Sequence, residues 1–294
     1  MPTLIETPSL RAAVGAPSPY QRLTVDDVTL AYSERGAGPA VVCLHAIGHG
    51  AGDFTRLAAR LADRHRVIAL DWPGHGRSGP DRVPTSAERY ADVLAGFVDR
   101  LGIEQATVIG NSIGGAAAIR WAAAHPGRAR GLVLENPGGL DPAADRLART
   151  VTAAMIRFFA AGRRQAWWFP WAFGAYYRTC VLGRTAGEQR TRIVRAGSEV
   201  APLLHDAWRS FATTTADIRE LAAGLACPVL FVWAKGDRFI QLGRSLPAIR
   251  RMANARVETV AGRHAAHLEA PETFERLVQE FLADQPAAVP TRSA

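Results

Sequence analysis

The stretch ATVIGNSIGGAAAI, residues 106–119, passes from a β-branched apolar run through glycines into an alanine-rich run. Val and Ile favour strands and Ala favours helices, so the stretch predicts a strand, a sharp turn and a helix. Its single serine, Ser112, lies at the turn within the pattern G-x-S-x-G, Gly110 to Gly114. In such a turn the strand and helix approach too closely for side chains at the glycines, and the serine oxygen stands above the sheet. Ser112 is therefore the candidate nucleophile.

Apolar strand candidates alternate with helical patterns on both sides of this stretch. A hairpin is expected at residues 23–36, with its turn at Asp26 and Asp27. Six later strand candidates are AVVCLH, RVIAL, ATVIG, RGLVLE, PVLFVWA and ARVETV, which begin at residues 40, 66, 106, 130, 228 and 255. Thr85 and Glu88 form a capping-box pattern that predicts the start of one intervening helix. The alternation predicts an α/β fold with a mostly parallel central sheet and helices on both faces.

The alternation of strands and helices stops after residue 140. Residues 141–215 have a helical pattern rich in Arg and Trp, and they contain no strand candidate of the earlier kind. We therefore expect a helical cap at 141–215 inserted into a core formed by residues 20–140 and 216–284. Residues 1–19 and 285–294 are expected to form a flexible leader and a flexible tail.

The composition excludes several classes of protein. The net charge is +8, but Lys235 is the only lysine and no tract of clustered Lys and Arg with interleaved aromatics occurs, so nucleic-acid binding is not expected. No apolar run reaches the ~18 residues that span a bilayer, and stable membrane insertion is not expected. Three widely spaced cysteines and no signal-peptide pattern favour a cytoplasmic protein. The partner expected is a small-molecule substrate, bound by a monomer or homo-oligomer.

A nucleophilic serine needs a general base and an acid that orients the base. Asp237 follows a strand candidate in the sequence AKGDRF, and His264 follows the next strand in AGRHAAH. We expect Asp237 to orient the imidazole and His264 to take the proton from Ser112. The alternatives are Glu135 as the acid, since it ends a strand beside the sharp turn at Ser112 (the elbow), and His267 as the base.

The oxyanion of an acyl-transfer intermediate needs backbone N–H donors. One expected donor is Ile113, at the start of the helix after Ser112. The second expected donor is Ile47, in the loop LHAIGHG that follows a central strand, where Ala46 is a candidate substrate contact. A further glycine loop, DWPGHGRSG at 71–79, lacks the ending of a phosphate-binding loop and is interpreted as structural.

Together these motifs resemble the α/β-hydrolase superfamily. The resemblance covers about residues 23–282 and rests on LHAIGHG, DWPGHGRS, GNSIGG, GDRF and GRHAAHLEAPE. GNSIGG and NPGGLDP look like the hydrolases that cleave carbon–carbon bonds in meta-cleavage products of aromatic degradation. Two features depart from that group: HAIG replaces a glycine-richer loop, and Ala265 stands where the group usually carries Trp.

The leading hypothesis is a serine hydrolase that cleaves a carboxylic ester or related acyl compound through an acyl-enzyme. The alternatives are a carbon–carbon hydrolase, an acyltransferase, or a non-catalytic ligand-binding protein of the same fold. The chemistry requires no metal or organic cofactor.

Candidate substrate contacts also include Asn111 beside the serine and the cap aromatics Trp168, Phe169 and Trp171. The cap stretch could instead rest on a membrane surface, although its arginines are not confined to one face.

Overall fold

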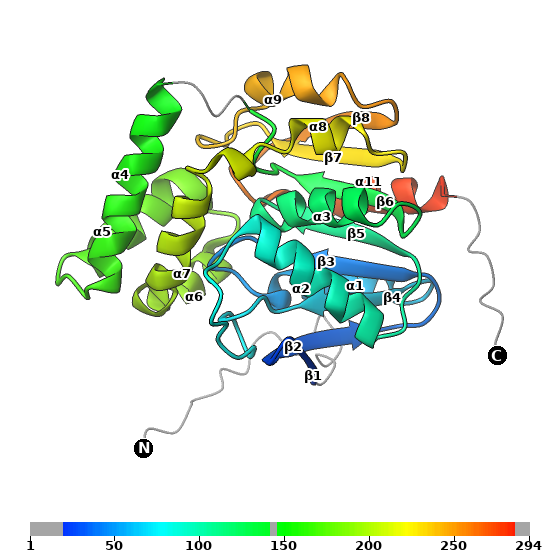
Figure 1. Ribbon diagram of the computed structural model, residues 1–294, viewed down its shortest axis with the longest axis horizontal. Coiled ribbons are helices and arrows are strands. Elements are labelled where there is room, and N and C mark those ends of the chain that lie inside the picture. The colour runs from blue at the N-terminus through cyan, green and yellow to red at the C-terminus, as the bar shows by residue number, and fades with distance from the viewer. Residues whose placement is uncertain (1–19, 142–145, 286–294) are drawn as a thin grey trace.

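A single eight-stranded sheet forms the centre of the molecule (Figure 1). The computed structural model describes residues 20–141 and 146–285. The strands are β1 (Gln21–Val25), β2 (Val28–Arg35), β3 (Ala40–Leu44), β4 (Arg66–Leu70), β5 (Ala106–Asn111), β6 (Ala129–Glu135), β7 (Val229–Ala234) and β8 (Ala255–Val260). Their spatial order is β1-β2-β4-β3-β5-β6-β7-β8.

The sheet is mixed at one edge and parallel elsewhere. β2 pairs antiparallel with β1 and with β4, whereas the pairs from β4 to β8 are parallel. The β1–β2 hairpin turns at Asp26 and Asp27, whose φ angles of 45° and 66° suit a tight hairpin turn. Every strand expected from the sequence is present, and the α/β fold class is confirmed.

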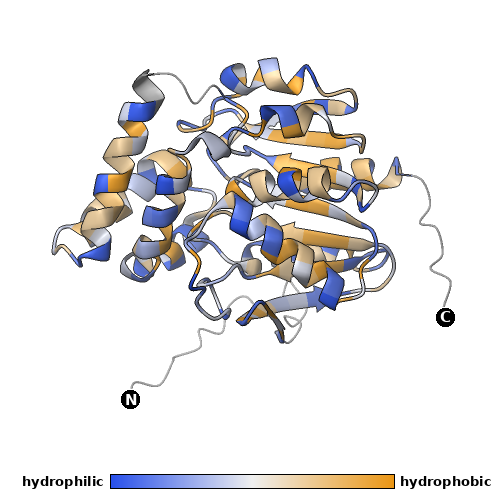
Figure 2. Ribbon diagram, in the orientation of Figure 1, coloured by the Kyte–Doolittle hydropathy of each residue, from blue (hydrophilic) through white to orange (hydrophobic). Residues whose placement is uncertain are grey.

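Helices cover both faces of the sheet because the parallel strands are apolar on both sides. In β3, Val41 and Cys43 belong to the core on one face, while Val42 and Leu44 belong to the core on the other. The first core also includes α1 (Thr55–Leu61) and α11 (Pro271–Ala283). The second includes α2 (Ala87–Arg100), α3 (Ile113–Ala124), α8 (Arg219–Ala223) and α9 (Leu242–Ile249). Figure 2 shows the hydrophobic strands between more mixed helices.

The helical insertion between β6 and β7 stands beside the sheet (Figure 1). It contains α4 (Arg146–Arg163), α5 (Phe169–Tyr176), the π-helical turn η2 (Tyr177–Val181), α6 (Gly187–Arg195) and α7 (Gly197–Ser210). Phe159, Phe169 and Phe173 are fully buried and form the centre of a separate aromatic core. We refer to residues 146–210 as the cap below.

Short helices complete the fold: η1 (Ala51–Phe54), η3 (Thr214–Ala216) and α10 (Ala266–Glu269). The start of α2 corrects one sequence expectation by a residue. Ser86, not Thr85, is the N-cap, and its side-chain oxygen accepts a hydrogen bond of 3.0 Å from the backbone N–H of Arg89. Among the described residues, no helix is both long and apolar enough to cross a membrane.

Candidate active site

Ser112 lies in a strained turn between β5 and α3. Its φ of 55° and ψ of −117° are unusual for a residue with a side chain, and such backbone costs about 1–3 kcal/mol. The flanking glycines allow the turn to close. A Cβ at Gly110 would lie 2.6 Å from the carbonyl oxygen of Gly114, and one at Gly114 would lie 2.5 Å from that of Leu44. The strand and helix thus meet as closely as the G-x-S-x-G pattern requires.

Asp237 and His264 form a buried pair beyond the ends of β7 and β8. The Nδ1 atom of His264 donates to Oδ2 of Asp237 at 2.6 Å. Burial alone would lower the pKa of His264, but the Asp237 carboxylate raises it above its usual value. The other oxygen of Asp237 accepts hydrogen bonds from the backbone N–H groups of Phe239 at 2.8 Å and Ile240 at 3.1 Å. The pair is therefore held in the orientation that a general base requires.

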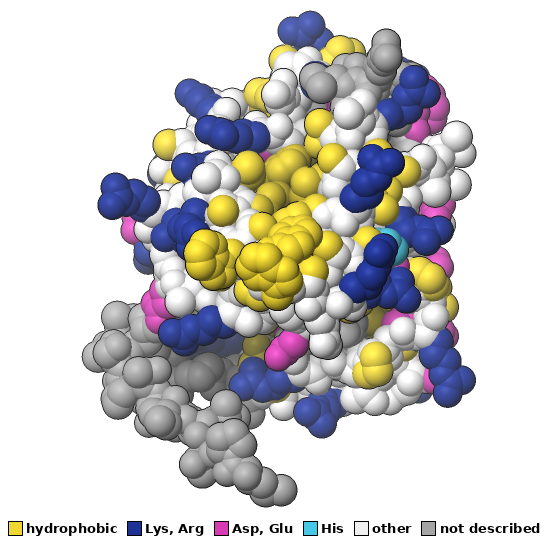
Figure 3. Space-filling model, turned by 90° about the vertical axis from the view of Figure 1, so that its left-hand side faces the viewer, with side chains coloured by type: hydrophobic (Ala, Val, Ile, Leu, Met, Phe, Trp, Pro, Cys, Tyr) yellow, Lys and Arg dark blue, Asp and Glu magenta, His cyan; other side chains and the backbone are white. Residues whose placement is uncertain are grey.

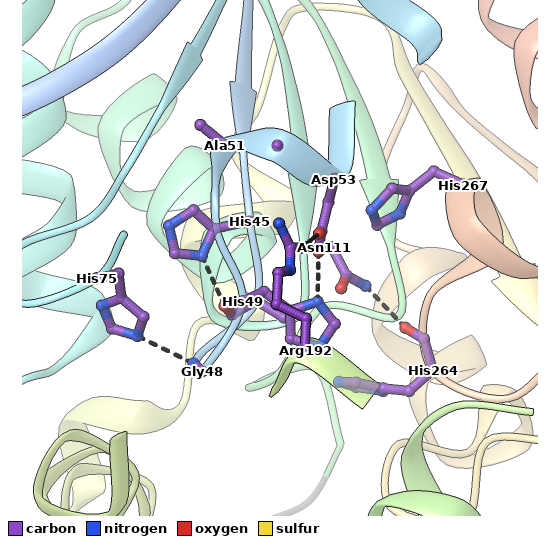
Figure 4. A network of polar contacts seen from close by, with 12 residues as sticks. His45, Gly48, His49, Ala51, Asp53, His75, Asn111, Arg192, His264 and His267 are labelled. Carbon is purple, nitrogen blue, oxygen red and sulfur yellow. Dashed lines mark hydrogen bonds and ion pairs between the residues drawn. The ribbon is translucent and has the colours of Figure 1, made fainter. Parts of the chain in front are cut away.

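Two asparagines fix the loops that carry this pair. The Asn136 side chain donates to Oδ2 of Asp237 at 2.8 Å and accepts from the backbone N–H of Ala234 at 3.0 Å. The Asn111 side chain donates to the carbonyl oxygen of His264 at 2.8 Å (Figure 4). Asn111 is fully buried and does not line the cavity described below, and its hydrogen bond supports the His264 loop.

His267 and Glu135, the alternative base and acid, are paired with each other. Both Nδ1 of His267 (2.8 Å) and its backbone N–H (3.0 Å) donate to Oε2 of Glu135. The imidazole stacks on Phe54, with ring centroids 4.7 Å apart, and its Nε2 is buried. Neither residue lines the cavity that contains Ser112.

The loop after β3 is braced by two buried histidines. The backbone N–H of Gly48 donates to Nε2 of His75 at 2.9 Å, and that of Trp72 donates to Nε2 of His45 at 3.0 Å. Their Nδ1 atoms donate to carbonyl oxygens, so each imidazole is satisfied in its neutral form. Burial lowers the pKa of both histidines to about 3. The DWPGHGRSG loop, interpreted as structural, therefore supports the candidate oxyanion loop through His75.

The expected oxyanion donors face a common space. Ile47 and Ile113 line the same cavity as Ser112 and His264, and Ala46 lies beside them. Within residues 20–141 and 146–285, neither the Ile47 nor the Ile113 backbone N–H donates to another residue. Two unengaged amides beside a serine are what an oxyanion hole needs.

A third histidine pair connects the cap to this loop. Nδ1 of His49 donates to Oδ2 of Asp53 at 2.6 Å, and Arg192 of α6 forms an ion pair with the other oxygen of Asp53 (Figure 4). Burial alone would raise the pKa of Asp53, but His49 and Arg192 hold it well below its usual value. Because the Asp53 side chain is fully buried in η1, the ion pair attaches the cap beside the candidate oxyanion loop.

The cavity between cap and core has a volume of about 460 Å³. Its aromatic lining comes from the cap, from the residue directly after it and from the loop after β7, and consists of Tyr176, Tyr177, Trp208, Phe211 and Phe239. The cap aromatics chosen from sequence do not line it. Phe169 is buried in the cap core, while Trp168 and Trp171 are 39% and 84% exposed. Their high density in the sequence did not distinguish rings that face the cavity from rings that face solvent.

No group of three or more His, Cys, Asp or Glu side chains suited to a metal occurs among the described residues. The polar groups around Ser112 are side chains and backbone amides. A hydroxyl, a histidine hydrogen-bonded to a carboxylate, and two backbone amides are the groups that nucleophilic acyl transfer uses.

Known proteins resemble this chain in both sequence and structure. A hydrolase from Comamonas testosteroni named for 2-hydroxy-6-oxo-6-phenylhexa-2,4-dienoate is 28% identical over 269 residues, which cover 88% of this chain and 92% of that protein. An enol-lactonase structure from Burkholderia xenovorans matches with a TM-score of 0.75 and 22% identity, over 90% of this chain and 100% of that one. A thermophilic esterase from Thermogutta terrifontis matches with a TM-score of 0.75 and 20% identity, over 90% and 98%.

The two solved structures support the fold alone, because their identity to this chain is low. The family evidence comes from the sequence. A family model described as alpha/beta hydrolase fold matches residues 39–271, which include the turn at Ser112, the candidate oxyanion loop and His264. The chain therefore belongs to the α/β-hydrolase family, as the motifs around Ser112 predicted.

Proposed function

We propose that this protein is a serine hydrolase that cleaves a carboxylic ester with an apolar acyl or alcohol part. The observation that carries the proposal is the convergence of Ser112, His264 and the amides of Ile47 and Ile113 on one aromatic-lined cavity. Each group has the role that acyl transfer requires, and the Ile47 and Ile113 amides donate to no other residue within the described ranges.

In the proposed reaction, Ser112 Oγ attacks the ester carbonyl while His264 takes its proton. Asp237 stabilises the resulting imidazolium, and the Ile47 and Ile113 amides stabilise the tetrahedral oxyanion. His264 then returns the proton to the leaving alcohol, which leaves an acyl group on Ser112. A water molecule, deprotonated by His264, hydrolyses this acyl-enzyme.

Turnover and covalent labelling of purified protein test the proposal. We expect p-nitrophenyl esters of increasing chain length to be hydrolysed, and a fluorophosphonate to label the wild type. Ser112→Ala should lose both, whereas Ser198→Ala, at an exposed position on α7, should keep both. Absence of turnover and of Ser112-dependent labelling would refute the proposal. Saturable ligand binding that persists in Ser112→Ala without product release would support the non-catalytic alternative.

Carbon–carbon cleavage is the second candidate. It is favoured by the 28% identity to the dienoate hydrolase, which extends over 88% of this chain. The same nucleophile and oxyanion hole would then act on a vinylogous ketone. Decay of the coloured 2-hydroxy-6-oxo-6-phenylhexa-2,4-dienoate, with little turnover of the ester panel, would favour this candidate. Transfer of the acyl group to an added alcohol would instead indicate an acyltransferase.

A further inference from the structure

Two tryptophans on the cap are almost fully exposed. Trp167 is 90% exposed and Trp171 is 84% exposed, whereas Trp72, Trp121 and Trp233 in the core are at most 1% exposed. Figure 3 shows a continuous hydrophobic area on this side of the molecule, with Lys and Arg side chains at its borders. Large apolar areas on a protein surface commonly mark interaction sites. These indoles therefore require an explanation beyond packing.

The segment that carries the exposed indoles is attached to the aromatic core of the cap. Trp167 and Trp171 are four residues apart. Trp167 lies in the turn before α5, and Trp171 lies in its first turn, where the backbone N–H of Ala172 donates to the carbonyl oxygen of Trp168. Trp168, between them, contacts the buried cap core, with its ring 6.2 Å from that of Phe158. Neither exposed indole lines the cavity. The pair is thus an outward feature of the cap, separate from the candidate active site.

The same segment carries positive charge only. Residues 146–187 contain no Asp or Glu, and their seven arginines are Arg146, Arg149, Arg157, Arg163, Arg164, Arg178 and Arg184. Arg157, Arg163 and Arg164 are exposed and make no ion pair with any residue in the described ranges. Arg163 ends α4 and Arg164 follows it, three residues before Trp167. A partner that suits this face must offer both apolar contact and negative charge.

We propose that the cap face around Trp167 and Trp171 docks the protein on an anionic lipid bilayer. Indole rings favour the bilayer interface because they are apolar with one polar N–H. Arginines beside them are attracted to anionic headgroups at the same depth. A second copy of the chain is disfavoured, because a symmetric contact would place two arginine-rich faces against each other.

Docking of this kind would be peripheral and would bring the cavity close to lipid. α4 contributes Thr152 and Ile156 to the cavity lining, and the same helix ends at Arg163, beside the exposed indoles. A bilayer on this face therefore lies against the element that also walls the cavity. The proposal concerns where the protein works, and it holds whichever substrate the cavity takes.

Vesicle sedimentation tests the proposal directly. The Ser112→Ala protein is used throughout, so that hydrolysis of lipid cannot alter the vesicles. At low ionic strength we expect binding to vesicles of phosphatidylcholine mixed with phosphatidylserine, and much weaker binding to phosphatidylcholine alone. Adding Trp167→Ala and Trp171→Ala should reduce the partition coefficient about tenfold or more. Adding Arg163→Gln and Arg164→Gln should reduce it about 30-fold, since each cation near such a surface contributes about 1 kcal/mol.

A charge-matched control separates location from net charge. Arg60→Gln with Arg64→Gln removes two exposed arginines in and after α1, on the core. This variant should bind within about threefold of its parent, and thermal unfolding should show that all variants are folded. Equal loss of binding in the control and in the Arg163/Arg164 variant would overturn the proposal. So would absence of binding at low salt, or a dimer that sedimentation velocity shows to depend on Trp167 and Trp171.

Discussion

Two histidine–carboxylate pairs lie three residues apart in the sequence and differ mainly in what surrounds them. His264 donates to Asp237 at 2.6 Å, and His267 donates to Glu135 at 2.8 Å. All four residues are buried, and in both pairs the carboxylate raises the pKa of the histidine although burial alone would lower it. Only His264 lines the cavity with Ser112, because the other imidazole is stacked against Phe54.

The difference teaches that pairing with a carboxylate does not identify a catalytic histidine. What distinguishes a candidate general base is that the ring nitrogen not bound to the carboxylate can reach the candidate nucleophile. The two carboxylates also differ in the number of other groups that donate hydrogen bonds to them. Besides its bond from His264, the Asp237 carboxylate accepts hydrogen bonds from Asn136 and from two backbone amides. Among the described residues, the Glu135 carboxylate accepts hydrogen bonds from His267 alone. We therefore propose a catalytic role for the His264–Asp237 pair and a structural role for the His267–Glu135 pair.

The largest expected effect is on turnover. His264→Ala should reduce kcat about 10⁶-fold, as when a triad acting as one unit loses its base. The matched variant His267→Ala removes the same ring from the second pair, and its kcat should fall less than about tenfold, since that ring does not reach the cavity. Steady-state kinetics on the best ester measure both. Similar losses in the two variants would contradict the assignment of His264 as the base.

The same two variants should rank in the opposite order for stability. His267→Ala leaves the buried Glu135 carboxylate without its imidazole partner, and breaking such a pair costs about 3 kcal/mol or more. His264→Ala should cost only about 1 kcal/mol, because Asp237 keeps its other donors. Urea unfolding followed by circular dichroism gives both free energies. A larger loss in His264→Ala would show that the second pair is not the structural one.

Histidines without a carboxylate partner should respond to pH in the opposite direction from the two pairs. Burial lowers the pKa of His75 to about 3, so its contribution to stability is present above its unfolded pKa of about 6.5 and is lost as the pH falls. For His264 and His267, whose pKa values are raised, the contribution is present at low pH and is lost as the pH rises through the folded pKa.

His75→Gln tests this contrast. Between about pH 7.5 and about pH 5, the variant should lose about 2 kcal/mol less unfolding free energy than the wild type, because the protonation of His75 on unfolding is removed. Its stability at the higher pH should be lower, because the hydrogen bond to Gly48 is altered. His125→Gln, which changes a half-buried histidine away from the site, is the control. An unchanged pH dependence in His75→Gln would contradict the assignment of His75 as a neutral histidine that supports the loop after β3.

Sequence patterns predicted the features that depend on short segments or on the order of segments along the chain. The eight strands, the elbow at Ser112 and the loops of Asp237 and His264 follow from apolar runs, glycines and strand ends. Chain order and loop position predicted His264 as the partner of Asp237, and the structure pairs them. The pairing of His267 with Glu135 was not predicted, because it depends on how the end of β6 and the loop after β8 meet in space. Asn136 was missed for the same reason. Its only sequence signal is its position directly after the strand that ends at Glu135.

The cap was the part least predictable from sequence. A dense run of aromatics indicates burial, yet Phe169 is fully buried while Trp171, two residues later, is exposed. The orientation of each ring depends on how α5 is rotated against α4 and α7, and no short-range pattern fixes that rotation. The domain boundaries at 141 and 215, and the substrate contacts in the cap, remain predictions.

The smallest expected effect isolates the strain at the nucleophile, which neither histidine pair shares. Ser112 holds a φ of 55°, where glycine is at little disadvantage but alanine is strained. Ser112→Gly and Ser112→Ala both lose the hydroxyl, so their difference reports the backbone. Ser112→Gly should be more stable than Ser112→Ala by about 1 kcal/mol, after the entropic cost of glycine is included. Thermal unfolding of the two inactive variants side by side measures this difference. Equal stability would mean that the elbow stores no strain, and that the serine is held there by its neighbours alone.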